Sequence, residues 1–160
     1  MGLRDIFKKV ALKEDNASPE QVSSCGKGKV IPLTEVKDEA FASEAMGKGY
    51  GLLPEKGEIY SPADGQVEMV FPTMHAIGLK TKQGAEVLIH IGINTVELGG
   101  KGFECLVKQG DQVTKGQLIE RFDKAAIERD GYDTTVMVII TNTDNYKKIA
   151  WEEDSLILEK

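Results

Sequence analysis

From Lys29 onward, the chain consists of short apolar runs separated by glycine- and proline-containing turns. These turns recur about every ten residues, a spacing typical of an antiparallel sandwich or barrel and not of alternating strands and helices. We therefore expect an all-β fold, an antiparallel β-sandwich or barrel-sandwich of short strands with minor helical turns. The strands are predicted at residues 30–33, 50–54, 58–62, 66–71, 75–81, 86–91, 117–122, 134–141 and 155–158.

Two local patterns refine this picture. Residues 136–140 are apolar at every position, so this strand is expected to be buried on both faces, in the centre of a sheet. Two short helical turns are also expected. One covers residues 124–130 after the capping side chain of Asp123, and the other covers residues 94–98.

The first 13 residues place apolar side chains at helical spacing, with basic side chains on the remaining face. Such a short basic amphipathic helix either stays a frayed tail in free solution or binds an anionic membrane surface. Residues 14–28 are polar and indicate a linker. We expect a flexible tail over residues 1–20 and a single domain over residues 21–160. The apolar positions of the tail are Leu3, Ile6, Phe7 and Val10, and the basic ones are Arg4, Lys8, Lys9 and Lys13.

Composition narrows the range of partners and compartments. The net charge of −6 argues against a nucleic-acid partner and favours steering toward a basic protein surface. No run of about 18 apolar residues occurs, so no membrane-spanning helix is expected. Cys25 and Cys105 lie in no metal-binding or redox spacing, and two free thiols fit a cytoplasmic protein.

The chain contains two histidines, His75 and His90, at the ends of two predicted strands that are joined by a polar turn at Lys82-Gln83-Gly84. If the turn has a two-residue loop, His75 lies directly opposite His90 on one face, with Cβ atoms about 5 Å apart. If Gly84 instead closes a three-residue loop, the register slips by one residue and one ring moves to the other face.

Paired imidazoles support three chemistries: ligation of a cation such as zinc, acid-base catalysis, and nucleophilic attack on phosphorus. Tight zinc binding needs a third or fourth protein ligand, and the sequence near the hairpin offers none at ligand spacing. We therefore expect only weak zinc binding by His75 and His90, completed by a ligand from a partner, and no cofactor. Many side chains around the histidines are apolar, which suits a group that is held and passed on rather than hydrolysed.

The central motif, residues 75–78 and 88–98, resembles the glucose-type enzyme IIA of the bacterial phosphoenolpyruvate-dependent sugar phosphotransferase system. The likeness extends over almost the whole chain. It includes Gly47-Lys48-Gly49, Ser61-Pro62-Ala63-Asp64-Gly65, Gly110-Asp111-Gln112-Val113, and the basic amphipathic opening.

This resemblance implies a phosphotransferase component that carries a phosphoryl group on His90. The donor would be the histidine phosphocarrier protein, and the acceptor would be a cysteine on the IIB domain of a sugar transporter. His75 matches the second active-site histidine, and Thr73 matches the hydroxyl that orients it. The resemblance also implies a cytoplasmic protein, either free or peripheral at the inner face of the membrane, and leaves regulatory target proteins open. The partner-docking positions implied by the family are Phe41, Phe71, Ile77, Leu88, Asn94, Val96 and Glu97.

One position departs from the family pattern, and two other functions stay open. Many relatives carry an aspartate where this chain has Asn94, so a contact with a basic group on the phosphocarrier is in doubt here. Residues 110–118 with Lys124 also resemble a lipoyl or biotinyl carrier domain, with Lys124 as the modified side chain. A metal-dependent hydrolase that uses both histidines is the third interpretation.

Overall fold

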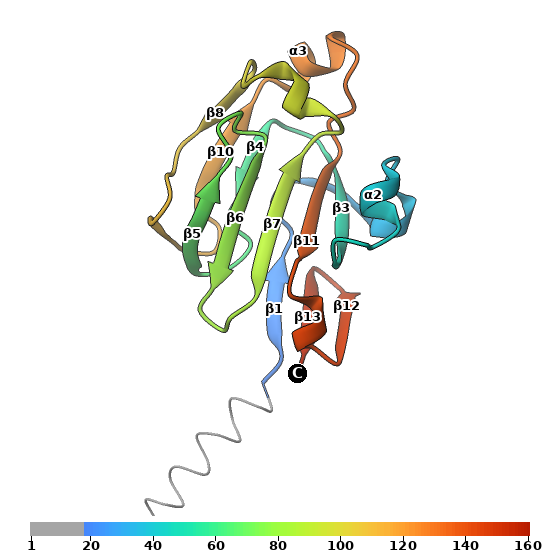
Figure 1. The fold of residues 1–160 in the computed structure, drawn as a ribbon, viewed down its shortest axis with the longest axis vertical. Helices are drawn as coiled ribbons and strands as arrows, with labels where there is room; N and C mark the ends of the chain where they lie inside the picture. The colour runs from blue at the N-terminus through green and yellow to red at the C-terminus, as the bar shows by residue number, and fades with distance from the viewer. Residues whose placement is uncertain (1–17) are drawn as a thin grey trace, which may run out of the picture.

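The computed structural model describes residues 18–160, so residues 1–17 of the tail expected over residues 1–20 lie outside this range. The described chain is built mainly from β-strands (Figure 1). The strands are β1 (Glu20–Ser23), β2 (Gly28–Pro32), β3 (Lys48–Pro54), β4 (Glu58–Tyr60), β5 (Gly65–Val70), β6 (Ala76–Thr81), β7 (Glu86–Ile91), β8 (Phe103–Cys105), β9 (Gln112–Val113), β10 (Leu118–Phe122), β11 (Val136–Ile140), β12 (Lys148–Glu152) and β13 (Ser155–Glu159). The helical segments are η1 (Leu33–Glu35), α2 (Glu39–Ala42), η2 (Thr95–Leu98), α3 (Lys124–Arg129) and η3 (Thr143–Asn145).

The strands form three sheets. The largest has the order β2-β3-β11-β7-β6-β5-β9, and the two three-stranded sheets have the orders β4-β10-β8 and β1-β13-β12. The paired strands run antiparallel, including the β5–β6, β6–β7, β7–β11 and β11–β3 pairs of the large sheet. The prediction of an antiparallel β-sandwich is therefore confirmed.

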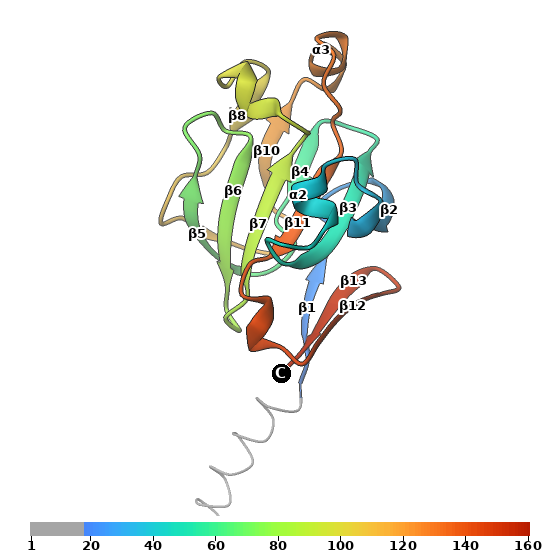
Figure 2. The same cartoon turned by 45° about the vertical axis from the view of Figure 1, so that its right-hand side comes forward.

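Strand β11 lies inside the large sheet and separates two hydrophobic clusters. Val136, Val138 and Ile140 belong to the main core between the sheets. Met137 and Ile139 point to the other face and pack with Leu33, Val36 and Phe41 in a smaller cluster. We call this second face, covered by η1 and α2, the outer face (Figure 2). The sequence prediction of a central strand buried on both sides is confirmed.

Several elements lie where the sequence analysis expected none, among them β1, β12 and α2. Strand β1 falls inside the stretch expected to be a linker, and it pairs with β13 from Glu20↔Leu158 to Ser23↔Ser155. Its pattern was hidden because only Val22 is apolar, while the buried Glu20 is held by polar partners. Helix α2 was also missed, because four residues are too few for a helical hydrophobic period.

The two expected helical turns are present. The side chain of Asp123 accepts a hydrogen bond from the backbone N–H of Ala126 and so caps α3. Segment η2 follows Asn94, which adopts the left-handed conformation with φ 63°. In the part of the chain that the structure describes, no helix has the length and apolar character needed to cross a membrane.

Candidate histidine-pair site

The β6–β7 hairpin places His90 on the outer face, in a register that differs from the expected one. Ala76, not His75, lies opposite His90. The connecting loop contains three residues, because Thr81 N–H donates to the carbonyl oxygen of Ala85 at 2.9 Å. The expectation of a two-residue loop was wrong, and the alternative closed at Gly84 is the one observed.

His75 nevertheless meets His90, because it precedes β6 and does not follow the alternation of that strand. The chain reverses at residues 71–74, where Met74 N–H donates to Phe71 O at 2.7 Å and Met74 adopts φ 60°. This turn brings the imidazole of His75 to that of His90, with 4.9 Å between ring centroids and an angle of 82° between the rings. The two side chains therefore converge through the turn and not through direct cross-strand pairing.

The tautomer of His90 follows from its hydrogen bond. Its Nδ1 lies 2.9 Å from the carbonyl oxygen of Gly92, and a carbonyl can only accept, so Nδ1 carries the proton in this contact. The lone pair of a neutral ring is then on Nε2. Gly92 adopts φ 83°, and a Cβ atom there would collide with the methyl group of Thr95, so glycine is needed to hold this carbonyl in place.

Thr73 fixes the second ring. Its hydroxyl lies 2.6 Å from Nδ1 of His75. When the hydroxyl donates to Nδ1, the proton of a neutral ring is on Nε2. His75 is only 4 % exposed, so this contact sets the orientation of a ring that is otherwise surrounded by protein.

Burial keeps both rings neutral. Burial, together with the neighbouring His75, lowers the pKa of His90 to about 4, while the Gly92 carbonyl and Asp38 oppose the shift. Burial also lowers the pKa of His75. At neutral pH the site thus presents an uncharged nucleophilic nitrogen beside an uncharged ring that can donate a hydrogen bond.

Two aromatic rings enclose the pair. Phe41 of α2 packs on His90 with 4.9 Å between centroids, and Phe71 packs on His75 at 5.4 Å. Asp38 caps α2 by accepting from Ala40 N–H at 3.0 Å, which places its charge on the side of His90. Sequence reasoning missed Asp38, although an aspartate two residues before an alanine-containing turn is a helix-cap signal.

Of the docking positions implied by the family, some are exposed at the surface and others are buried. Val96 is 51 % exposed and Asn94 and Glu97 are exposed, while Phe71 and Leu88 are half-buried. Phe41 is buried against the His90 ring. Ile77 does not lie on the docking surface, contrary to the expectation from the family. It is fully buried in the main core, because β6 directs it to the inner side of the sheet.

An apolar hollow of about 310 Å³ lies on the same face, beside the histidines. Its lining includes Phe71 and Leu88, and also Met69, which is 52 % exposed. Sequence reasoning missed Met69 as a surface residue. A bulge in the β5–β6 pairing between Val67 and Met69 shifts its side chain out of the alternation.

The two other candidate chemistries find little support. Lys124 begins α3 and its ammonium group lies 3.0 Å from a carboxylate oxygen of Glu128, so it does not stand at the tip of a hairpin as a swinging-arm lysine does. Within residues 18–160, no group of three or more His, Cys, Asp or Glu side chains is placed to hold a metal ion. His75 and His90 alone leave a tetrahedral ion incomplete.

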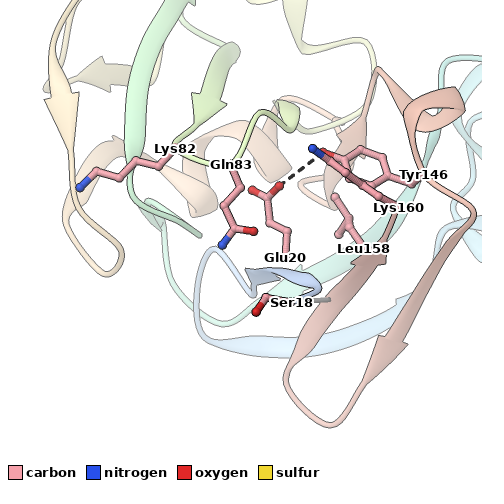
Figure 3. A pocket seen from close by; sticks show the side chains of 7 residues that line it. All are labelled: Ser18, Glu20, Lys82, Gln83, Tyr146, Leu158 and Lys160. Carbon is pink, nitrogen blue, oxygen red and sulfur yellow. Dashed lines mark hydrogen bonds between the residues drawn. The ribbon is translucent and has the colours of Figure 1, made fainter. Parts of the chain in front are cut away.

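A second hollow lies at the opposite end of the β6–β7 hairpin, where Lys82 and Gln83 form the turn (Figure 3). Its volume is about 540 Å³. The Glu20 carboxylate at its floor accepts hydrogen bonds from Tyr146, at 3.3 Å, and from Thr81. Both oxygens already have hydrogen-bond partners, which accounts for the burial of this carboxylate in β1. Glu20 therefore does not form a second reactive site.

Comparison with known proteins identifies the family. Residues 20–146 match the family described as phosphoenolpyruvate-dependent sugar phosphotransferase system, EIIA 1. The chain is 48% identical over 129 residues to a PTS system beta-glucoside-specific EIIBCA component of Bacillus subtilis (strain 168), and 47% identical over 130 residues to one of Halalkalibacterium halodurans. These matches cover 81% of this chain but only 21% and 20% of the relatives, so the chain spans about a fifth of their length.

A solved structure agrees with this assignment. The glucose permease IIA from Mycoplasma capricolum superimposes with a TM-score of 0.76 and 29% sequence identity, over 88% of this chain and 94% of that one. Together with the matched residues 20–146, this likeness confirms the resemblance seen in the sequence. The chain belongs to the glucose-type EIIA family of the phosphoenolpyruvate-dependent sugar phosphotransferase system, whose members are phosphocarrier domains in sugar transport.

Proposed function

We propose that Nε2 of His90 is the atom that carries the phosphoryl group. The observation that supports this is the contact between His90 Nδ1 and the Gly92 carbonyl, which leaves the lone pair on Nε2. In the transfer, Nε2 attacks phosphorus, a P–N bond forms, and the bond from phosphorus to the donor nitrogen breaks. The positive charge that develops on the ring is stabilised where Nδ1–H points at the carbonyl oxygen.

His75 acts on the phosphoryl oxygens and not on phosphorus. The Thr73 hydroxyl donates to Nδ1 of His75, so the Nε2–H group is free to donate a hydrogen bond to a group held on His90. A neutral donor beside the phosphoryl group stabilises negative charge as it moves, because the buried setting strengthens such contacts.

The donor is the histidine phosphocarrier protein and the acceptor is a cysteine of a transporter IIB domain. Both partners approach the outer face, where the histidine pair lies beside the apolar hollow and the exposed Val96. An apolar, partly concave surface around a nucleophile excludes water while the two proteins exchange the group. We place this exchange in the cytoplasm, which fits the free thiols of Cys25 and Cys105.

Zinc binding and a membrane contact are secondary parts of the proposal. His75 and His90 bind zinc weakly alone and more tightly when a partner supplies a carboxylate. The basic amphipathic residues 1–13 act as a membrane-binding tail joined to one folded domain. Full-length protein should co-sediment with vesicles that contain anionic phosphatidylserine, and less so as salt rises; equal binding to neutral vesicles would contradict the electrostatic role.

The central test is phosphoryl uptake by the full chain. The protein is incubated with phosphoenolpyruvate, enzyme I and the histidine phosphocarrier protein, and its intact mass is measured. We expect a gain of one phosphoryl group that is labile in acid and stable in alkali, and no gain for His90→Gln. A wild-type protein that stays unmodified, or a His90→Gln protein that is labelled, would overturn the proposal.

A further inference from the structure

The rim of the histidine-pair site carries a hydrogen bond that the phosphoryl-transfer chemistry does not use. The phenol of Tyr132 donates to Oε1 of Glu97 at 3.1 Å. The two residues are far apart in the sequence. Glu97 belongs to η2, which follows the His90 strand, and Tyr132 comes just after α3. Their contact therefore joins two separate segments beside the site.

Both ends of this contact are fixed by the backbone. Tyr132 N–H donates to Ile127 O at 3.2 Å, and the Tyr132 ring packs against the main core. Glu97 N–H donates to Asn94 O at 3.1 Å, and the hydroxyl of Thr95 bonds the carbonyl of Ile91 at the end of the His90 strand. With the backbone held at both ends, the phenol of Tyr132 sets the direction of the Glu97 side chain.

The segment that carries Glu97 forms part of the wall of the site. Directly after η2, the backbone at Gly100 approaches Thr73 and Met74, the residues that set the position of His75. Val96, next to Glu97, is 51 % exposed. A protein that reaches His90 over this wall therefore passes the Glu97 carboxylate.

The partner of Glu97 is a neutral phenol, so the hydrogen bond does not cancel the charge of the carboxylate. A lysine or arginine would orient the carboxylate and cancel its charge, whereas a phenol orients it and leaves the charge intact. Within residues 18–160, no lysine or arginine forms an ion pair with Glu97, while the nearby Asp130 is paired with Lys101 at 4.0 Å. The hydrogen bond to Glu97 raises the pKa of Tyr132, as expected for a phenol that donates to an ionised carboxylate.

Because residue 94 is an uncharged asparagine, the negative charge of Glu97 matters more for docking. It is exposed, uncharged and in the left-handed conformation at the start of η2. The rim therefore has no charge at position 94, and the nearest acidic side chain on the same segment is Glu97.

We propose that Tyr132 is a positioning residue that holds the Glu97 carboxylate as the acidic contact for a basic side chain of the docking partner, in place of a charge at position 94. This inference rests on the proposed function. It assigns Tyr132 a role in docking and none in the chemical step, so its effect is expected in KM and not in kcat.

The test measures initial rates of phosphoryl uptake from the phosphorylated histidine phosphocarrier protein at low salt. Tyr132→Phe should raise KM about two- to fivefold with kcat unchanged, because an exposed ion pair contributes only modestly. Glu97→Gln should raise KM at least as much. The double variant should resemble Glu97→Gln, since Tyr132 acts only through the carboxylate. High salt should remove the differences between these proteins.

Two further variants test whether the change in KM comes from the Tyr132–Glu97 contact. Tyr60→Phe is the matched control, because the phenol of Tyr60 also donates to a glutamate, Glu58, at 2.8 Å, in a sheet that does not contain β6 or β7. Its kinetics should equal those of the wild type. Asn94→Asp in the Tyr132→Phe background should lower KM again, because it restores a carboxylate to the rim.

The outcomes separate this inference from the proposed function. A wild-type protein that takes up no phosphoryl group would overturn both. Normal uptake with an unchanged KM for Tyr132→Phe, or with additive effects in the double variant, would overturn the role of Tyr132 alone. A change in kcat would likewise place Tyr132 in the chemical step and contradict a docking role.

Discussion

The imidazoles of His75 and His90 cross at 82°, with 4.9 Å between their centroids, and each is held through its Nδ1 by a different kind of partner. His90 faces a carbonyl that can only accept, whereas His75 faces a hydroxyl that can donate. With the Thr73 hydroxyl as the donor to Nδ1 of His75, the two neighbouring rings have opposite tautomers. One presents a lone pair and the other presents an N–H group.

This asymmetry predicts different losses for the two histidines. His90→Gln should take up no phosphoryl group, because the nucleophile is gone. His75→Gln should accept the group but pass it on about a hundredfold more slowly, as expected for the loss of one hydrogen-bond donor to a transferring group. Rapid-quench labelling separates the two steps. Normal labelling of His90→Gln beside an unlabelled His75→Gln would reverse the assignment.

Phe41 is predicted to control the pKa of His90. Burial lowers this pKa to about 4, so removing the covering ring in Phe41→Ala should rehydrate His90 and raise the pKa toward 6.5. An NMR titration of the imidazole signals measures the change. Phe71→Ala is the control, because Phe71 packs on His75; it should move the pKa of His75 more than that of His90.

The same titration has a consequence for stability. The pKa of His90 is lower in the folded state than the ordinary 6.5, so its contribution is fully present above pH 6.5 and is lost as the pH falls toward 4. Phe41→Ala should weaken this pH dependence. A steeper loss of stability in the variant would contradict burial as the cause.

Gly92→Ala is predicted to damage both stability and uptake. Its φ of 83° is strained for alanine, and the new methyl group would collide with Thr95. Shifting the chain would move the carbonyl that holds His90. Gly84→Ala is the control, because it has φ 104° but nothing within 4 Å of the added atom. Both variants should lower Tm through strain of about 1–3 kcal/mol. Only Gly92→Ala should slow phosphoryl uptake.

Glu120 is predicted to make the protein less stable at alkaline pH. It is fully buried in β10, and neither carboxylate oxygen has a hydrogen-bond partner within residues 18–160. Burial raises its pKa from 4.5 to about 8, with the neighbouring Cys105 thiol opposing the shift. The folded pKa is raised, so its stabilising contribution is complete below pH 4.5 and is lost as the pH rises through 8.

Glu120→Gln should remove this dependence, because an amide does not ionise. Its urea unfolding midpoint should depend less on pH between 4.5 and 8 than that of the wild type, which falls over this range. Glu104→Gln is the control, since Glu104 lies on the paired strand β8 but is exposed and near Arg121. Parallel curves for Glu120→Gln and the wild type would show that the buried carboxyl does not titrate in this range.

Elements with a local signal in the sequence were predicted correctly. The strict apolar pattern of residues 136–140 was sufficient to place a central strand, because burial on both faces leaves no polar position. The cap at Asp123 was found because a helix N-terminus has a local chemical signal. These features depend on neighbours in the sequence.

Features that depend on a single turn residue or on distant segments were not predicted. The hairpin register depends on one loop residue, and the meeting of the histidines depends on the left-handed Met74, which no sequence pattern indicated. The burial of Ile77 was misjudged because the family resemblance gives positions near a site but not the direction of a side chain. The contact between Tyr132 and Glu97 joins distant segments and has no local signal.

Strand β11 sends alternate side chains into two clusters that do not share a residue. The outer cluster is small, and it contains Phe41, the residue of α2 that covers His90. A brief local opening of this layer would uncover His90, the proposed phosphoryl acceptor, while the larger core stays closed. The stability of the fold and the cover over His90 therefore depend on different sets of side chains, so a substitution in the outer cluster can expose His90 in a protein that is still folded.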